Sequence, residues 1–250
     1  TNSVLFFTGG NAAIPSEIYT NFLSKLANQN LSVYVAPSDL NSVEEILDTI
    51  EDEYYDVTNI GHSSGAVNVL KCSNHNKNTK KAVLLDPVNS DVLFNSFNIQ
   101  VNPFSEKKKN VLSFKYINDL LVINAKKSYE WKLFPPTIPF IPAFKINVDS
   151  ITKENMNVNI IESEEYGHSD ILNPFWGEIM HNTISKGSED RNEETIDKYH
   201  DWLAIQIKNF VTNIKQLKPS SITVYNSEDE AEEVESEEVE GEEVEGVTEE

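Results

Sequence analysis

The stretch Gly61-His62-Ser63-Ser64-Gly65 decides how this chain folds. Before it lies Tyr55–Ile60, which is typical of a short strand, and after it lies Ala66–Leu70, which is typical of the first turns of a buried helix. A serine with a glycine two residues away on each side, between a strand and a helix, is the pattern of a sharp turn that lifts the serine clear of a sheet. Larger side chains at the glycine positions would collide with the neighbouring strand and helix. We therefore predict that Ser63 is presented as a nucleophile.

Composition indicates one folded domain followed by an acidic tail. The chain has 250 residues and a formal net charge of −21. Residues 226–250 hold 14 Asp or Glu and no Lys or Arg, so the rest of the chain has 27 acidic and 20 basic residues. The tail repeats Glu-Glu-Val and has too few apolar residues to form a core. We predict a domain over residues 1–217 and a disordered acidic tail over residues 218–250.

Several classes of function are disfavoured by the same composition. Neither part offers the basic surface that binds nucleic acid. The single cysteine, Cys72, excludes an intrachain disulfide and a cysteine-based zinc site, and no other metal or cofactor motif is present. No apolar run approaches the roughly 20 residues of a membrane span. The apolar start, Ser3–Thr8, is too short for a secretion signal, so these features favour an intracellular location and a function without cofactors.

Strands alternate with helices along the chain. Continuous apolar runs such as Val4–Phe7 are typical of strands buried on both faces of a parallel sheet. The predicted strands are Val4–Phe7, Leu31–Ala36, Asp56–Ile60, Lys81–Leu85, Val111–Tyr116 and Asn155–Ile161. The predicted helices begin near Ile14, Ser42, Ala66 and Glu193, and the last of them ends near Ile214. This order predicts an α/β fold with a mostly parallel sheet and helices on both faces.

The polar candidates follow the ends of the predicted strands, where ligands bind in such sheets. A serine needs a base, and the base needs an acidic partner that fixes its tautomer. Only one histidine, His168, follows a predicted strand on a glycine-containing loop, and it is the candidate base. The other four are His62, whose side chain should point away from that of Ser63, and His75, His181 and His200.

Two residues are candidates for the acid. Asp86 ends one predicted strand and Asp119 follows the next, so position leaves both open, while Asp170 is expected to brace the histidine loop. The N–H of Ser64 should form one half of an oxyanion hole. The other half should come from the first strand's loop, at Gly10 or Asn11.

Four motifs together resemble the chlorophyllases. They are Gly61-His62-Ser63-Ser64-Gly65, Leu85-Asp86-Pro87-Val88, Phe134-Pro135-Pro136 and Glu165-Tyr166-Gly167-His168-Ser169-Asp170-Ile171-Leu172. The resemblance covers about residues 4–211. It implies the α/β-hydrolase fold, a triad of Ser63, Asp86 and His168, and cleavage of a hydrophobic ester such as the phytyl ester of chlorophyll.

The sequence departs from that family in three places. The elbow continues as Ser64-Gly65-Ala66 where the family has a larger basic residue and two glycines, and the first loop reads Thr8-Gly9-Gly10-Asn11. Asp119 stands where many other α/β-hydrolases keep their acid.

The proline-rich segment 133–143 is either a loop that covers the site or a surface excursion. We therefore expect a serine esterase for a hydrophobic substrate, with a general lipase or esterase, or a non-catalytic binding protein of the same fold, as alternatives.

Overall fold

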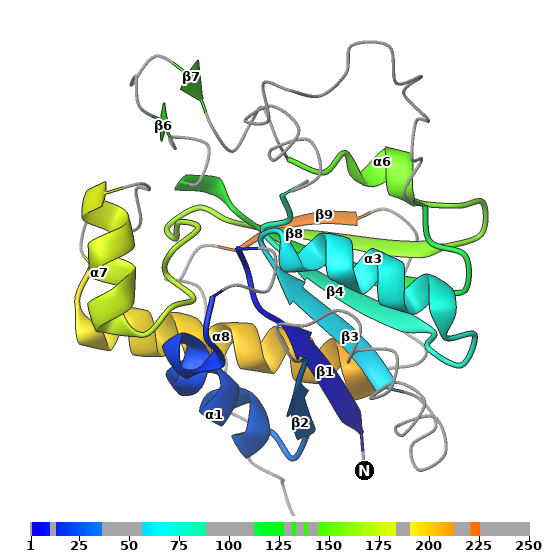
Figure 1. The fold of residues 1–250 in the computed structure, drawn as a ribbon, viewed down its shortest axis with the longest axis horizontal. Helices are drawn as coiled ribbons and strands as arrows, with labels where there is room; N and C mark the ends of the chain where they lie inside the picture. Colours follow the sequence, from blue (N-terminus) through cyan, green and yellow to red (C-terminus); the bar gives the residue numbers. More distant parts are fainter. Residues whose placement is uncertain are drawn as a thin grey trace, which may run out of the picture.

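The computed structural model describes residues 2–10, 14–36, 57–88, 113–127, 132–133, 138–139, 145–183, 191–212 and 221–225. In this part of the chain a seven-stranded sheet has the order β2-β1-β3-β4-β5-β8-β9 (Figure 1). Its strands are β1 (Ser3–Phe7), β2 (Ser32–Val35), β3 (Val57–His62), β4 (Lys81–Leu85), β5 (Asp119–Ala125), β8 (Asn157–Ser163) and β9 (Ser221–Tyr225). The described helices are η1 (Ser16–Tyr19), α1 (Thr20–Asn28), α3 (Gly65–His75), α6 (Val148–Ile151), α7 (Pro174–Thr183) and α8 (Glu193–Thr212).

Every neighbouring pair in this sheet is parallel. The carboxyl ends of the strands therefore meet at one edge, which is where an open α/β sheet places its site. The serine turn lies between β3, the third strand in this order, and α3, which is the strand–turn–helix context of the nucleophile in the α/β-hydrolase fold. The predicted fold class is confirmed.

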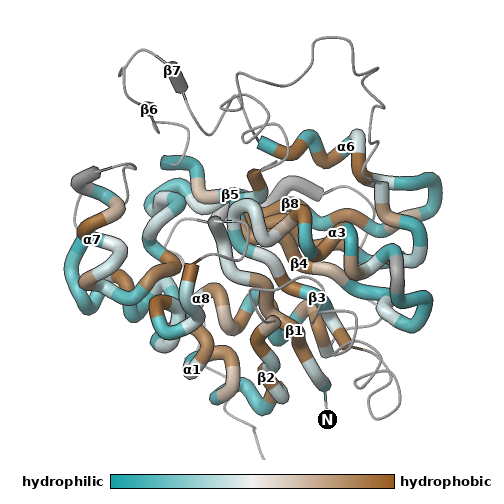
Figure 2. Tube along the Cα trace, viewed as in Figure 1, coloured by the Kyte–Doolittle hydropathy of each residue, from teal (hydrophilic) through white to brown (hydrophobic). Residues whose placement is uncertain are grey.

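Alternation along the strands divides the core into two layers. On one face Phe6, Val83 and Ile123 pack with buried residues of α1 and α8. On the other face the next residues along each strand pack with α3 and α6, for example Phe7 and Leu84. Figure 2 shows hydrophobic residues concentrated along the central strands, between these helices. Both faces are covered, which is why the strands read as continuous apolar runs.

Helix α8 covers its face with one apolar stripe. Five apolar residues that recur at helical spacing are all buried: Ile196, Tyr199, Leu203, Ile207 and Phe210. Two aspartates of α8 also form ion pairs with α1 at the surface, since the Nζ of Lys25 lies 2.8 Å from Asp197 Oδ2 and 2.7 Å from Asp201 Oδ2.

The strand predicted at Val111–Tyr116 is wrong over its described residues, because 113–118 contain no strand. Phe114 and Ile117 are buried in an irregular connection. The strand is β5, whose run from Leu120 to Ala125 is buried throughout. Asp119 therefore begins a strand instead of following one, and it pairs in register with Lys81 at the start of β4. The segment 111–116 is interrupted by Ser113 and Lys115, whereas Leu120–Ile123 is continuously apolar, as a strand that is covered on both faces requires.

Three other predictions concern the domain boundary, the helix at Ser42 and the proline-rich segment. Strand β9 lies at residues 221–225, beyond the predicted domain boundary at 217, and it pairs with β8. The boundary itself stays a prediction, and residues 226–250 lie outside the described residues. So does the helix predicted to begin at Ser42. In the proline-rich segment, β6 (Lys132–Leu133) and β7 (Ile138–Pro139) form an antiparallel pair.

Helix α7 was missed by the sequence analysis. Proline at its first position, Pro174, was an available signal, since proline is favoured there. The helix leaves Phe175, Trp176 and Ile179 at 65%, 44% and 38% exposure. Among the described helices, none has both the length and the apolar character that crossing a membrane requires.

Truncation of Leu203 tests the layer formed by α8. Leu203 is 1% exposed, so Leu203→Ala should lower the free energy of unfolding by about 2–5 kcal/mol. Ile205→Ala is the matched control on the same helix, because Ile205 is 40% exposed and its loss should cost much less. Urea denaturation of both variants measures the difference, and equal losses would contradict the described burial of α8.

Candidate active site

Ser63 adopts a left-handed backbone conformation, with φ of 56°, between the end of β3 and the start of α3. Such a conformation costs a non-glycine residue on the order of 1–3 kcal/mol and persists only where its surroundings hold it. Two backbone hydrogen bonds do so. The N–H of Ser63 donates to Leu85 O at 2.9 Å, and the N–H of Val88 donates to Ser63 O at 3.1 Å. The serine turn is thereby fixed to the end of β4.

The two glycines of the turn are required by space. A Cβ on Gly61 would lie 2.6 Å from the backbone oxygen of Gly65, and one on Gly65 would lie 2.5 Å from the backbone oxygen of Phe7. Real Cβ atoms essentially never approach backbone atoms this closely. The helix α3 therefore passes so near β1 and β3 that neither position accepts a side chain, as the sequence pattern predicted.

The structure brings Ser63, Asp86 and His168 together. His168 Nε2 lies 2.9 Å from Ser63 Oγ, and His168 Nδ1 lies 2.5 Å from Asp86 Oδ2. Asp86 and His168 are each 4% exposed, whereas Ser63 has intermediate exposure. Three residues from three strand ends thus form one chain of hydrogen bonds whose serine end is the most accessible.

Asp86 is held as firmly as the serine. Its own φ is 43°, in the left-handed region, and its N–H donates to Ile123 O at 2.7 Å. Its second carboxylate oxygen, Oδ1, accepts the N–H of Ala125 at 3.2 Å. Since one oxygen is occupied by β5, the other is left to face His168.

The partners determine which atoms carry the protons. A carboxylate can only accept, so the Nδ1 of His168 donates to Asp86. In the neutral ring Nε2 then has a lone pair, and it accepts the hydroxyl proton of Ser63. This is the arrangement in which a histidine can take a proton from a serine.

Asp119, the alternative acid, lies at the opposite edge of the sheet. It occupies the first position of β5, whereas Asp86 follows the last position of the neighbouring strand β4. Its Oδ1 accepts a hydrogen bond from Asn157 Nδ2 at 2.8 Å. Asp119 was expected to follow a strand and so to lie beside His168. This expectation is wrong, because Asp119 begins β5 and lies at the opposite ends of the strands.

The oxyanion candidates are placed in part. Ser64 is buried directly before α3, and Gly10 follows β1 with φ of 62°. The loop after β1 lies against the serine turn, since a Cβ on Gly9 would be 3.2 Å from the Cβ of Ser63. Asn11 lies outside the described residues. The roles of Ser64, Gly10 and Asn11 stay predictions.

Asp170 braces the histidine loop, as predicted. Its Oδ2 accepts the N–H of Gly167 at 2.7 Å, and its Oδ1 pairs with the guanidinium of Arg191. His200 Nε2 donates to the backbone oxygen of the same aspartate at 3.0 Å. Burial lowers the pKa of His200 to about 4, so this histidine is a neutral donor inside the core.

Tyr19 and His62 form a polar pair beside the site that the sequence analysis missed. Tyr19 Oη lies 2.9 Å from His62 Nδ1, and His62 Nε2 lies 3.1 Å from the backbone oxygen of His168. The rings of His62 and His168 have centroids 4.7 Å apart. The sequence predicted only that the side chain of His62 points away from that of Ser63. It did not predict the contacts of His62 with Tyr19 and His168, which are 43 and 106 positions away in sequence.

Burial keeps both members of this pair uncharged. Removal from water, together with a smaller contribution from the neighbouring His168, lowers the pKa of His62 to about 3. Burial also raises the pKa of the Tyr19 hydroxyl above its ordinary value. At neutral pH the pair therefore consists of a phenol and a neutral imidazole.

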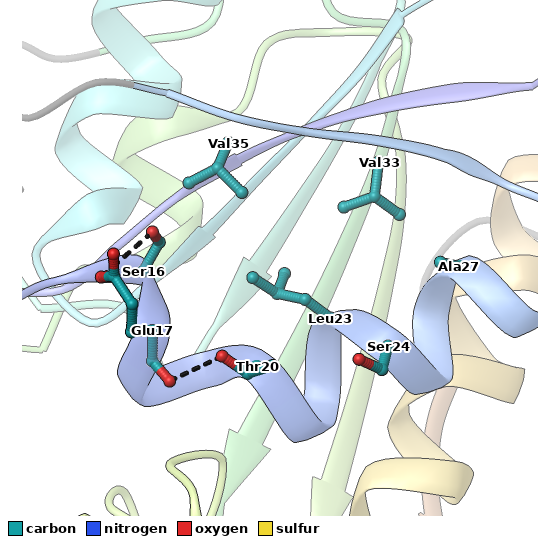
Figure 3. Close-up of a pocket in the computed structure, with 8 residues that line it drawn as sticks. All are labelled: Ser16, Glu17, Thr20, Leu23, Ser24, Ala27, Val33 and Val35. Carbon is teal, nitrogen blue, oxygen red and sulfur yellow. Dashed lines mark hydrogen bonds between the residues drawn. The ribbon is translucent and has the colours of Figure 1, made fainter.

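A groove of about 330 Å³ lies away from these residues, between the η1–α1 segment and β2 (Figure 3). Leu23 and Ala27 of α1 and Val33 and Val35 of β2 line it. Figure 3 shows Glu17 at one end, where its backbone oxygen accepts from Thr20 Oγ1. Neither Ser63 nor His168 lines this groove, so it is separate from the candidate active site.

Comparisons with known proteins find likeness of structure alone. No protein-family model matches the chain, and no curated protein matches it. The esterase domain of a Rhodothermus marinus protein is 12% identical, with a TM-score of 0.49 over 84% of this chain and 87% of that chain. A predicted CIB-like hydrolase from Thermoplasma acidophilum is 13% identical, with a TM-score of 0.43 over 83% and 86%. An arylesterase is 12% identical, with a TM-score of 0.44 over 84% and 75%. Likeness at this level transfers neither activity nor site residues.

Replacement of Gly65 by alanine tests the close packing of the serine turn. Alanine in a helix is normally more stable than glycine by about 0.5–1 kcal/mol. At Gly65 we expect the opposite sign, a loss of about 1–3 kcal/mol or more, because the added methyl meets the backbone of β1. Ser24→Ala, at an exposed position of α1, is the control and should change the free energy of unfolding by less than about 0.5 kcal/mol. A stabilised Gly65→Ala variant in urea denaturation would show that α3 lies farther from β1.

Proposed function

We propose that this protein is a serine hydrolase that cleaves a carboxylic ester with a hydrophobic group. The observation that carries the proposal is the continuous set of hydrogen bonds from Asp86 through His168 to Ser63. A serine on a strained turn, a histidine that accepts its proton and a buried carboxylate that orients the histidine are the parts that acyl transfer requires. All three follow the carboxyl ends of parallel strands.

The chemistry follows from the positions of the protons. Ser63 Oγ attacks the ester carbonyl while His168 Nε2 takes the hydroxyl proton, and the carbonyl oxygen becomes an oxyanion. The N–H groups of Ser64 and Gly10 are proposed to stabilise that oxyanion. Collapse releases the alcohol with the proton from His168 and leaves an acyl group on Ser63. Water then repeats the two steps, which releases the acid and restores the serine.

Two features support a hydrophobic substrate. The helix that follows the histidine loop, α7, exposes Phe175, Trp176 and Ile179, and exposed apolar groups of this kind often mark binding surfaces. The motifs around Asp86 and His168 also resemble those of chlorophyllases. We therefore propose a chlorophyllase-like hydrolysis of a phytyl-type ester as the first reaction to test, with a general esterase or lipase as the alternative.

A binding protein of the same fold would keep this architecture without turnover. The two possibilities differ in the reactivity of one oxygen atom. An activated serine reacts with a fluorophosphonate, whereas a serine that only fills a turn does not. Reactivity of Ser63 therefore separates an enzyme from a binding protein before any substrate is known.

Labelling with a fluorophosphonate probe tests the nucleophile. We expect the wild type to be labelled and the Ser63→Ala variant to lose labelling completely, because the hydroxyl of Ser63 is the one hydrogen-bonded to Nε2 of the base His168 at 2.9 Å. Ser24→Ala removes a hydroxyl from the exposed face of α1 and should be labelled at the wild-type rate. Mass spectrometry of the labelled peptide locates the adduct. A folded wild type that never reacts would reject the proposed function.

A matched pair of variants tests the acid. Asp86→Asn should lower kcat for a p-nitrophenyl ester by about 10⁴-fold, since the amide favours the wrong tautomer of His168. Asp119→Asn makes the same chemical change at the other edge of the sheet and should leave kcat within a few fold. Circular dichroism checks that both variants fold. The reverse pattern, with activity lost only in Asp119→Asn, would exclude Asp86 as the acid.

A further inference from the structure

The buried pair Tyr19 and His62 has no part in the reaction steps described above. Tyr19 is fully buried and His62 is 3% exposed. Burying polar side chains costs free energy unless every polar atom has a partner. Here each of them has one. The N–H of Gly9 donates to Tyr19 Oη at 3.1 Å, and Tyr19 and His62 continue the chain to the backbone oxygen of His168.

The directions of these hydrogen bonds can be worked out from one end. A backbone oxygen can only accept, so the proton of His62 must lie on Nε2, facing His168. In a neutral ring Nδ1 then has no proton, and Tyr19 must donate to it. Tyr19 Oη in turn accepts from Gly9. The tyrosine therefore selects one tautomer of His62, the tautomer that can hold His168.

These hydrogen bonds connect His168 to the segment that carries Ser63. His62 directly precedes Ser63, so the nucleophile and the residue that holds His168 belong to the same turn. His168 is then bonded twice to that turn, through its backbone oxygen to His62 at 3.1 Å and through its Nε2 to Ser63 at 2.9 Å. The first bond limits movement of the histidine's backbone relative to the serine. It also joins the loop after β1 to the histidine loop, through Gly9 and Tyr19.

We propose that His62 and Tyr19 are positioning residues of the active site: His62 holds the backbone of His168 at the distance that the Ser63–His168 hydrogen bond needs, and Tyr19 fixes the tautomer of His62. This inference rests on the proposed function. Displacement of a reacting group by about 1 Å can cost on the order of 10²-fold in rate. An apolar pair would fill the same space beside Phe6, whose ring lies 5.1 Å from that of Tyr19, but it would leave His168 without this restraint.

Paired substitutions at His62 test the restraint. His62→Leu removes the donor to His168, and we expect the second-order rate of fluorophosphonate labelling to fall about 10–100-fold. His62→Gln keeps an N–H that can reach the same oxygen, so it should recover most of the rate. With a p-nitrophenyl ester the loss should appear in kcat, with KM nearly unchanged. Equal rates for His62→Leu and His62→Gln, with both variants folded, would overturn the proposal.

A second pair tests the tyrosine. Tyr19→Phe removes only the hydroxyl that selects the tautomer, and a rate loss of about 10-fold is expected. Tyr116→Phe removes a hydroxyl from a half-buried tyrosine just before β5, at the opposite ends of the strands from Asp86, and it should keep the wild-type rate. A Tyr19→Phe variant that loses stability but labels at the wild-type rate would show a purely structural role.

Nitrogen NMR of the histidine rings provides a measurement that does not depend on the variants folding. In the wild type at pH 7, His62 should have its proton on Nε2 and none on Nδ1. The Nδ1-protonated tautomer would overturn the proposal whatever the labelling shows. Failure of the proposed function is seen separately, because it appears as a wild type that does not label, and the positioning role is then rejected with it.

Discussion

The left-handed backbone at Ser63 is the constraint on which the rest of the site depends. It is unfavourable for a serine, and it is stabilised by hydrogen bonds to Leu85 and Val88 on the neighbouring strand and loop. It also requires α3 to start within contact distance of β1 and β3, which only glycine at 61 and 65 permits. The conformation of Ser63 therefore depends on the neighbouring parallel strand, which binds its backbone, and on the close approach of α3, which the two glycines permit.

The parallel sheet brings residues that are far apart in the sequence close together. Ser63 and His168 are 105 positions apart, and Asp86 and His168 are 82 apart, yet each pair is joined by a hydrogen bond. Because each strand ends at the same edge, the loops need only be short and stiff to bring their first side chains together. Asp86 shows this most clearly: β5 binds its backbone and one of its carboxylate oxygens, and the remaining oxygen is left for the histidine.

Buried polar groups next to the site also fix the position of the histidine loop. Asp170, Arg191 and His200 fix the histidine loop from one direction, and Tyr19 and His62 fix it from the other. A hydrogen bond in the interior is electrostatically stronger than one in water, so these bonds favour one arrangement of the loop over others. The loop that carries His168 is therefore held by side chains on both sides, while Ser63 remains partly accessible.

The sequence by itself determined the elements whose signals are local. These were the glycine-bounded turn at Ser63, the continuous apolar runs of the central strands, the stripe of α8 and the position of His168 after β8. It left Asp86 and Asp119 open, because the strand was predicted before residue 118 and Asp119 was therefore expected to follow it. The pairing of β4 with β5 decided this, by placing Asp119 at the start of its strand. Tyr19 and His62 gave no signal either, since a hydrogen bond across 43 positions leaves no trace in local spacing. Tertiary structure alone could bring those residues together, because it depends on which strands become neighbours.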